Sequence, residues 1–164
     1  MKRIGIYYGS STGTTAEEAL RIASALGVNP IDVHDVGSAH PSSVADYDLL
    51  VLGTSTWGDG ELQDDWNDFI AALEAMDLSD KEVALFGSGD ESHSDTFCDA
   101  VAELHERLEP TGCRFIGEYN VAGYDFDSSK AMKGDGEAIG LLLDDVNHPD
   151  LTDGRIEAWA LTIK

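Results

Sequence analysis

The segment that decides the fold reads Ile4-Gly5-Ile6-Tyr7-Tyr8-Gly9-Ser10-Ser11-Thr12-Gly13-Thr14-Thr15. Its apolar part, residues 3–8, predicts a strand that leads into a loop of glycines and hydroxyl side chains. Small and apolar residues then recur at helical spacing and predict a helix over residues 14–26. Because the first backbone N–H groups of a helix lack partners within the helix, such a loop forms a receptor for a phosphate group.

This loop has no cationic side chain. No Lys or Arg occurs between Arg3 and Arg21, so hydroxyl groups and backbone dipoles must hold the anion. A nucleotide-hydrolysing loop instead has a Lys after its last Gly, which reaches the outer phosphates. The pattern therefore favours a ligand with one terminal phosphate and a large neutral remainder.

The rest of the chain alternates strands with helices. Further strands are predicted at residues 31–36, 48–53, 83–87 and 115–116, and further helices over 66–76, 97–108 and 152–163. This alternation indicates an α/β fold, a doubly wound parallel sheet with right-handed crossovers and helices on both faces.

Polar, Gly-rich residues from 117 to 136 interrupt the fifth strand. A second apolar stretch, residues 139–143, is either the resumption of that strand or an added edge piece. With no internal repeat or linker, residues 1–164 are expected to form one domain.

The composition is strongly acidic, with 32 Asp and Glu against 10 Lys and Arg and a net charge of −22. Such a surface repels nucleic acid and anionic membranes and attracts basic proteins. We interpret the local cluster of acids as a docking surface, although solubility or adaptation to a saline cytoplasm would produce the same composition. The cluster consists of Asp59, Glu61, Asp64, Asp65 and Asp68.

The chain shows no apolar run near the ~20 residues that span a bilayer, and its start lacks a signal-peptide pattern. We expect a cytoplasmic monomer that does not bind membranes. Cys98, in a predicted helix, and Cys113, near a predicted strand, have no second Cys or His at metal-ligand spacing. We expect two reduced packing thiols and no metal site.

Two more loops, residues 54–60 and 87–93, follow predicted strands and should meet the first loop at one sheet edge, where such folds bind ligands. Trp57 is either a hydrophobic anchor or a flat wall for a planar aromatic ligand. Gly87 and Gly89 would allow close backbone approach. His93 is either a second planar group or a solvated side chain.

Together these segments resemble the flavodoxins, small one-electron carriers that bind flavin mononucleotide (FMN). The resemblance covers nearly the whole chain, and the interruption of the fifth strand resembles the insertion of the long-chain subgroup. It implies a five-stranded parallel sheet in the order 2-1-3-4-5. The matching segments are residues 6–19, 55–59, 61–65, 87–90, 122–126, 129–131, 140–141 and 150–152.

The resemblance also implies roles for individual residues. Trp57 would stack on the inner face of the isoalloxazine ring, Gly58 would face its N5 edge, and Gly89 and Asp90 would line its pyrimidine edge. No Tyr lies in the third loop, where most relatives place one on the outer ring face, so His93 is the candidate substitute. The phosphate would be bound by Ser10, Ser11, Thr12, Gly13, Thr14 and Thr15, and the other candidate contacts are Ser55, Thr56, Asp59, Gly60 and Ser88.

The implied function is electron transfer and not substrate conversion, with FMN shuttling between oxidised, semiquinone and hydroquinone states at low potential. The implied partners are basic redox proteins: donors like ferredoxin-NADP reductase or pyruvate oxidoreductase, and acceptors such as nitrogenase or activating enzymes. One alternative is an FMN-dependent NAD(P)H reductase. Another is a flavodoxin-like module without redox function, such as a phospho-signalling receiver, although Gly9-Ser10 and Gly53-Thr54 stand where a receiver needs carboxylates.

Overall fold

The centre of the computed structural model is a parallel sheet in the order β10-β5-β3-β1-β2. The structure describes residues 2–10, 13–57, 61–90, 97–124, 126, 129–134, 136–145 and 147–164. For residues 57 and 61 it describes the backbone alone. Counted along the chain, the order is the predicted 2-1-3-4-5, which is confirmed. The strands are β1 (Ile4–Gly9), β2 (Val33–Asp35), β3 (Leu49–Trp57), β5 (Glu82–Ser88) and β10 (Leu141–Leu143).

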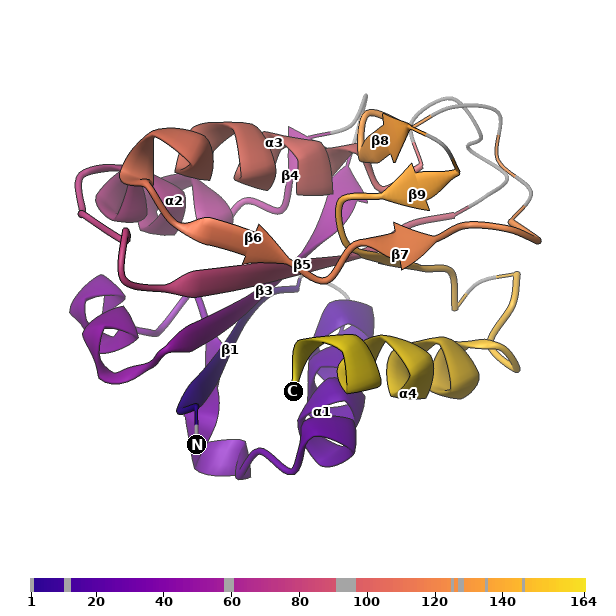
Figure 1. Ribbon diagram of the computed structural model, residues 1–164, viewed down its shortest axis with the longest axis horizontal. Helices are drawn as coiled ribbons and strands as arrows, with labels where there is room; N and C mark the ends of the chain where they lie inside the picture. Colours follow the sequence, from indigo (N-terminus) through magenta and orange to yellow (C-terminus); the bar gives the residue numbers. More distant parts are fainter. Residues whose placement is uncertain are drawn as a thin grey trace.

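The fifth position of the sheet is shared by two strands. β6 (Arg114–Ile116) pairs with residues 82–84 of β5, and β10 pairs with residues 86–88. The stretch 139–143 therefore contains the resumption of the interrupted strand. Between these two strands the insertion forms a separate antiparallel sheet of β7 (Tyr119–Asn120), β8 (Met132–Gly134) and β9 (Glu137–Ala138), which lies beside the edge of the main sheet (Figure 1).

Helices cover both faces of the main sheet. α1 (Thr14–Leu26) and α4 (Thr152–Ile163) lie on one face, and α2 (Trp66–Glu74) and α3 (Asp99–Leu108) lie on the other (Figure 1). The side chains of β3 alternate between the two resulting cores: Leu49 and Val51 face α1 and α4, whereas Leu50 and Leu52 face α2 and α3. Burial on both faces explains the apolar run in this strand.

Several predicted boundaries are wrong. The strand predicted at 31–36 is restricted to β2, because Pro30 begins the 3-10 turn η1 (Pro30–Asp32) and leaves Ile31 77% exposed. The loop predicted from residue 54 begins later, since β3 continues to Trp57 by pairing with the short antiparallel strand β4 (Glu61–Leu62). The other 3-10 turns are η2 (Pro41–Asp46) and η3 (Glu109–Thr111).

The helix predicted over 97–108 begins at Asp99. Cys98, expected inside the helix, precedes it with a positive φ of 53°. The helix predicted over 66–76 ends at Glu74. In the part of the chain that the structure describes, no helix combines the length and apolar character that crossing a membrane requires.

Gly140 determines how closely β10 approaches β5. A Cβ atom at this position would lie 2.2 Å from the carbonyl oxygen of Leu85. That atom belongs to the backbone of a central strand and cannot rotate away. The resumed strand therefore requires a residue without a side chain at this point.

We expect Gly140→Ala to lower the free energy of unfolding by about 1–3 kcal/mol, the usual cost of overpacking. Gly154→Ala is the matched control, because a Cβ there meets nothing within 4 Å. In helix α4 the control should raise stability by at most about 1 kcal/mol. Urea denaturation measures both variants, and equal stabilities would contradict the close approach.

Candidate cofactor site at the carboxyl edge of the sheet

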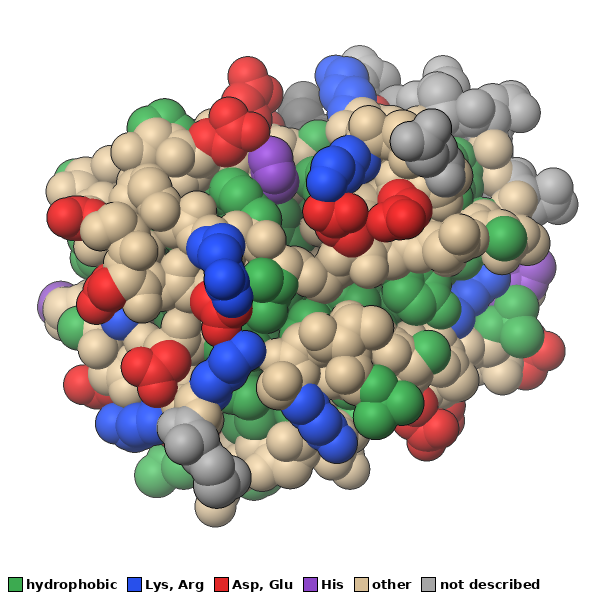
Figure 2. Space-filling view, in the orientation of Figure 1, with side chains coloured by type: hydrophobic (Ala, Val, Ile, Leu, Met, Phe, Trp, Pro, Cys, Tyr) green, Lys and Arg blue, Asp and Glu red, His purple; other side chains and the backbone are tan. Residues whose placement is uncertain are grey.

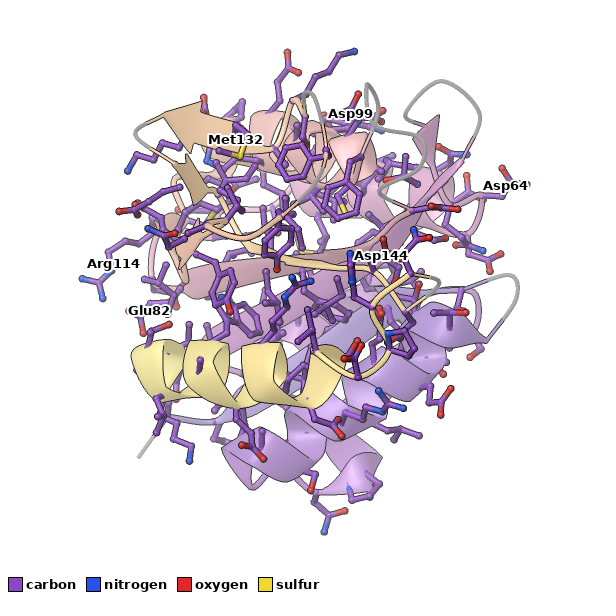
Figure 3. The ribbon with its side chains drawn as sticks, turned by 90° about the vertical axis from the view of Figure 1, so that its right-hand side faces the viewer. Asp64, Glu82, Asp99, Arg114, Met132 and Asp144 are labelled. Atoms are coloured by element: carbon purple, nitrogen blue, oxygen red, sulfur yellow. The ribbon has the colours of Figure 1, made fainter. Side chains whose placement is uncertain are left out.

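Strand register brings the three predicted loops to one edge of the sheet. Gly9 of β1 lies beside Thr54 of β3, and Ser55 lies beside Ser88 of β5. The loop after β10 reaches the same edge, because Leu143 also lies beside Ser88. In Figure 3, residues that follow strand ends (Asp64, Asp144) lie toward the right, and residues at strand starts (Glu82, Arg114) lie at the left.

The first loop ends in an open helix start. Gly13 adopts a left-handed conformation, with φ of 93°, that favours glycine. Its N–H donates to Ser10 Oγ at 3.0 Å, and Glu17 N–H donates to its carbonyl oxygen at 3.0 Å. The N–H groups of the first turn, at Thr14 and Thr15, therefore lack acceptors within the helix. A Cβ at Gly13 would meet nothing within 4 Å, so the helix start is accessible.

This donor set fits a phosphate. N–H groups without acceptors in the helix, the positive end of the helix dipole and neighbouring hydroxyls all favour an anion, and none of them needs a cation. Ser11 and Thr12, which the sequence assigns to the same loop, lie outside the described residues.

Two threonine hydroxyls anchor the start of the second loop to neighbouring segments through hydrogen bonds. Gln63 N–H donates to Thr54 Oγ1 at 3.2 Å, and Ala100 N–H donates to Thr56 Oγ1 at 3.3 Å. Thr56, a predicted contact, thus joins the end of β3 to the start of α3. Gly58, Asp59 and Gly60 lie outside the described residues, as does the side chain of Trp57.

Gln63 and Trp66, which were not among the predicted site residues, also support the first loop. A Cβ at Gly9 would lie 2.4 Å from Gln63 Oε1 and 2.6 Å from Trp66 Cδ1. Trp66 Nε1–H in turn donates to the carbonyl oxygen of Gly53 at 2.8 Å. The start of α2 is therefore packed against the ends of β1 and β3.

The third loop is held from the loop after β10. Gly89 N–H donates to the carbonyl oxygen of Leu143 at 2.9 Å. Asn147 Nδ2 donates to Asp90 Oδ1 at 2.7 Å and to Asp144 Oδ2 at 2.8 Å. Asn147 and Asp144 were not among the predicted site residues. The sequence feature that could have identified them is an amide among carboxylates directly after an apolar strand. His93 lies outside the described residues.

A buried polar chain connects the first and third loops. Thr15 Oγ1 lies 3.1 Å from Ser88 Oγ, and Ser88 also forms a hydrogen bond with Glu18. Thr15 and Ser88 are predicted contacts, whereas Glu18 was missed. The sequence feature that could have identified Glu18 is its position on the apolar face of α1, four residues before Ile22. Burial, more than any other factor, raises the pKa of Glu18 well above its ordinary value.

Comparison with known proteins gives the family. The family model described as flavodoxin matches residues 6–159. The flavodoxin of Haemophilus influenzae is 41% identical over 164 residues, which cover 99% of this chain and 94% of that protein. Flavodoxin 1 of Escherichia coli K12 is 41% identical over 160 residues, covering 97% and 91%.

The chain belongs to the flavodoxin family. Among solved structures, a Fusobacterium nucleatum flavodoxin bound to flavin mononucleotide superposes with a TM-score of 0.88 at 29% identity, covering 99% of this chain and 97% of that one. The predicted resemblance and the flavodoxin fold are both confirmed.

The two thiols of this flavodoxin are free and protected to different degrees. Cys98 is fully buried behind the third loop, and a Cβ at Gly89 would lie 2.9 Å from its Sγ. Burial is the largest cause that raises the pKa of the Cys98 thiol well above its ordinary value. Cys113 is half-buried, and burial raises its pKa as well.

We expect Cys98 to resist Ellman's reagent at neutral pH in the native protein, because the thiolate is the reactive form. A Cys113→Ser variant isolates this thiol, and its absorbance change should appear only when urea unfolds the chain. Labelling of the native variant at the rate of a free thiol would contradict the burial of Cys98.

Proposed function

We propose that this chain carries single electrons on a non-covalently bound FMN at the carboxyl edge of the main sheet. The observation that carries the proposal is the uncharged, open start of α1, where Gly13, Ser10 and Thr15 present the donor set of a phosphate site. The solved relative with FMN bound supports the choice of ligand. The chain is an electron-transfer protein and not a substrate-converting enzyme.

We assign the ligand's parts to the three loops. Trp57 would cover the inner ring face, His93 would cover the outer face, Gly58 would meet the N5 edge, and Gly89 and Asp90 would line the pyrimidine edge. Residues 10–15 hold the phosphate, and Ser55, Thr56, Asp59, Gly60 and Ser88 complete the site. The hydrogen bonds of Thr56 and of Asn147 support this assignment, because they join the end of β3 to α3 and the third loop to the loop after β10 at the same edge.

When bound, FMN supplies the one-electron chemistry, and the protein sets its energy. The loops at this edge contain no Lys or Arg over residues 9–15, 53–66, 87–99 and 144–151. A carboxylate about 10 Å from a negatively charged flavin opposes that charge by roughly 0.4–1.7 kcal/mol. Since roughly 1.4 kcal/mol corresponds to about 59 mV for one electron, several carboxylates would lower the second potential by about 100 mV before salt screening.

Charge is also separated along the strands. Lys2 and Arg3 precede β1, Lys81 precedes β5, and Arg114 begins β6, so these bases lie at the amino ends. The opposite edge carries acids, including Asp64, in the four loops without bases. On the face shown in Figure 2, Lys and Arg side chains lie among acidic ones.

This polarity favours basic redox proteins that approach the acidic edge. As donors we propose proteins like ferredoxin-NADP reductase or pyruvate oxidoreductase, and as acceptors nitrogenase or activating enzymes. A cytoplasmic location and a monomeric state stay predictions.

FMN should bind the apoprotein with quenching of flavin fluorescence, and much more tightly than riboflavin, which lacks the phosphate. Thr15→Val should weaken FMN binding by about tenfold or more, the effect of one hydrogen bond to a charged group, and leave riboflavin binding nearly unchanged. Fluorescence titration measures both ligands.

A protein that binds neither flavin would refute the proposed function. Steady turnover with NADPH alone, without an added reductase, would favour the alternative of a flavin-dependent reductase.

Electron transfer from a ferredoxin-NADP reductase should slow by at least about tenfold when ionic strength rises from about 0.05 to about 0.5 M, because salt screens attraction between exposed charges. Asp64→Asn should slow transfer at low salt, whereas Asp80→Asn, an equal charge change near the amino end of β5, should not. Stopped-flow spectroscopy measures the rates. Equal effects of the two substitutions would contradict docking at the acidic edge.

A further inference from the structure

A carboxyl group is buried directly behind the proposed phosphate loop. Glu18, in the second turn of α1, is 0% exposed and forms a hydrogen bond with Ser88. Ser88 Oγ lies 3.1 Å from Thr15 Oγ1, where either hydroxyl can be the donor. Among the described residues, Oε2 of Glu18 has no hydrogen-bond donor, and the carboxylate that interacts with it, Asp145, can only accept when ionised. A buried, half-satisfied carboxylate would be costly, so this arrangement favours the protonated acid.

The charged groups around Glu18 also favour its proton. Burial is the largest cause of its raised pKa, and the neighbouring Asp145 is the second; Ser88 and Arg21 act in the opposite direction. Arg21 does not neutralise Glu18 by itself, since its guanidinium lies 3.8 Å from Asp145 and 3.7 Å from Asp153. The titratable and charged groups near Glu18 are Glu17 and Arg21 on α1, Asp144 and Asp145 after β10, Cys98 before α3, and Asp153 on α4.

The three side chains form a relay whose direction depends on that proton. A protonated Glu18 can donate to Ser88, which donates to Thr15, so that the Thr15 hydroxyl hydrogen is free for an acceptor in the loop. An ionised Glu18 accepts from Ser88, which then accepts from Thr15. In that state Thr15 offers only lone pairs to the loop, and a negative charge lies behind it.

We propose that Glu18 is a positioning residue for the cofactor phosphate: with its proton it makes Thr15 a donor to the phosphate, and without its proton it opposes phosphate binding. This inference rests on the proposed function, because it assumes FMN in the loop. It adds a pH-dependent control of cofactor affinity that the loop residues alone would not have.

The direction of the pH effect on FMN affinity follows from the linkage between phosphate binding and protonation of Glu18. A bound phosphate favours protonated Glu18, so FMN affinity should fall as pH rises through the pKa of Glu18. Glu18 also makes the stability of the FMN-free protein depend on pH. Because its folded pKa is raised, its contribution to stability is present at low pH and is lost as pH rises through the folded pKa. Glu18→Gln removes both effects, since a glutamine amide donates to Ser88 at every pH.

The test compares FMN dissociation constants of the wild type and Glu18→Gln from about pH 6 to about pH 9 by fluorescence titration. If the phosphate shifts the pKa of Glu18 by about one unit, the wild-type constant should rise about tenfold relative to the variant over this range. The phosphate's own titration is common to both proteins and cancels in the ratio. Glu17→Gln is the matched control, an equal charge change with its side chain 68% exposed, and should follow the wild type.

Two further measurements separate the possible causes. Riboflavin should show no difference between the wild type and Glu18→Gln. Ser88→Ala, which breaks the relay and leaves Glu18 in place, should weaken the pH dependence of FMN binding, and it also serves if Glu18→Gln does not fold. In FMN-free protein, the stability of Glu18→Gln relative to the wild type should increase with pH in urea denaturation.

FMN binding with the same pH profile in the wild type and Glu18→Gln would overturn the inference and leave the proposed function intact. A difference that follows sodium or calcium concentration at constant pH would also overturn it, because a cation and not a proton would then neutralise the carboxyl group. Failure of every variant to bind FMN would refute the proposed function instead.

Discussion

The parallel pairing of β3 with β1 on one side and β5 on the other is the constraint on which the rest of the structure depends. It buries both faces of β3 and makes the connections that leave β1, β3 and β5 start from the same edge. The hydroxyl loop, the loop after β3 and the loop after β5 must then lie side by side. Glycines at the closest approaches, such as Gly53 against the Phe86 ring, allow this spacing without a shift in the sheet.

The loops are held in place by polar contacts between residues far apart in sequence. Thr56 joins the end of β3 to α3, and Asn147 joins the third loop to the loop after β10. Ser88, the last residue of β5, joins that strand to α1. Each of these side chains lies at or after the end of a different strand. A site assembled this way can keep its shape although its loops contain no Lys or Arg to hold the ligand.

At the cofactor edge, the negative charge that attracts basic partners repels the phosphate of the ligand. The acidic edge that favours basic partners and a low potential also disfavours a phosphate ligand, because both are negative. The start of α1 offsets this by presenting backbone dipoles and hydroxyls, and a neutral Glu18 avoids adding another charge behind the loop. Arg114 and Lys2 are at the far end of the strands, where they pair with Glu82 and do not reach the ligand.

Periodicity and loop chemistry were sufficient to predict the parallel sheet, the helices on both faces and the phosphate loop, because each is encoded in neighbouring residues. The sheet order came from the resemblance to the flavodoxins. Local boundaries depended on tertiary contacts: β3 continues past residue 54 by pairing with β5 at Ser55 and with β4 at Thr56 and Trp57, and the positive φ of Cys98 delays the start of α3. Whether residues 139–143 resumed the fifth strand or formed a separate edge was decided by pairing with β5. The role of Glu18 needed the folded chain, since its partner Ser88 is 70 residues away and a contact at that distance leaves no periodic pattern in the sequence.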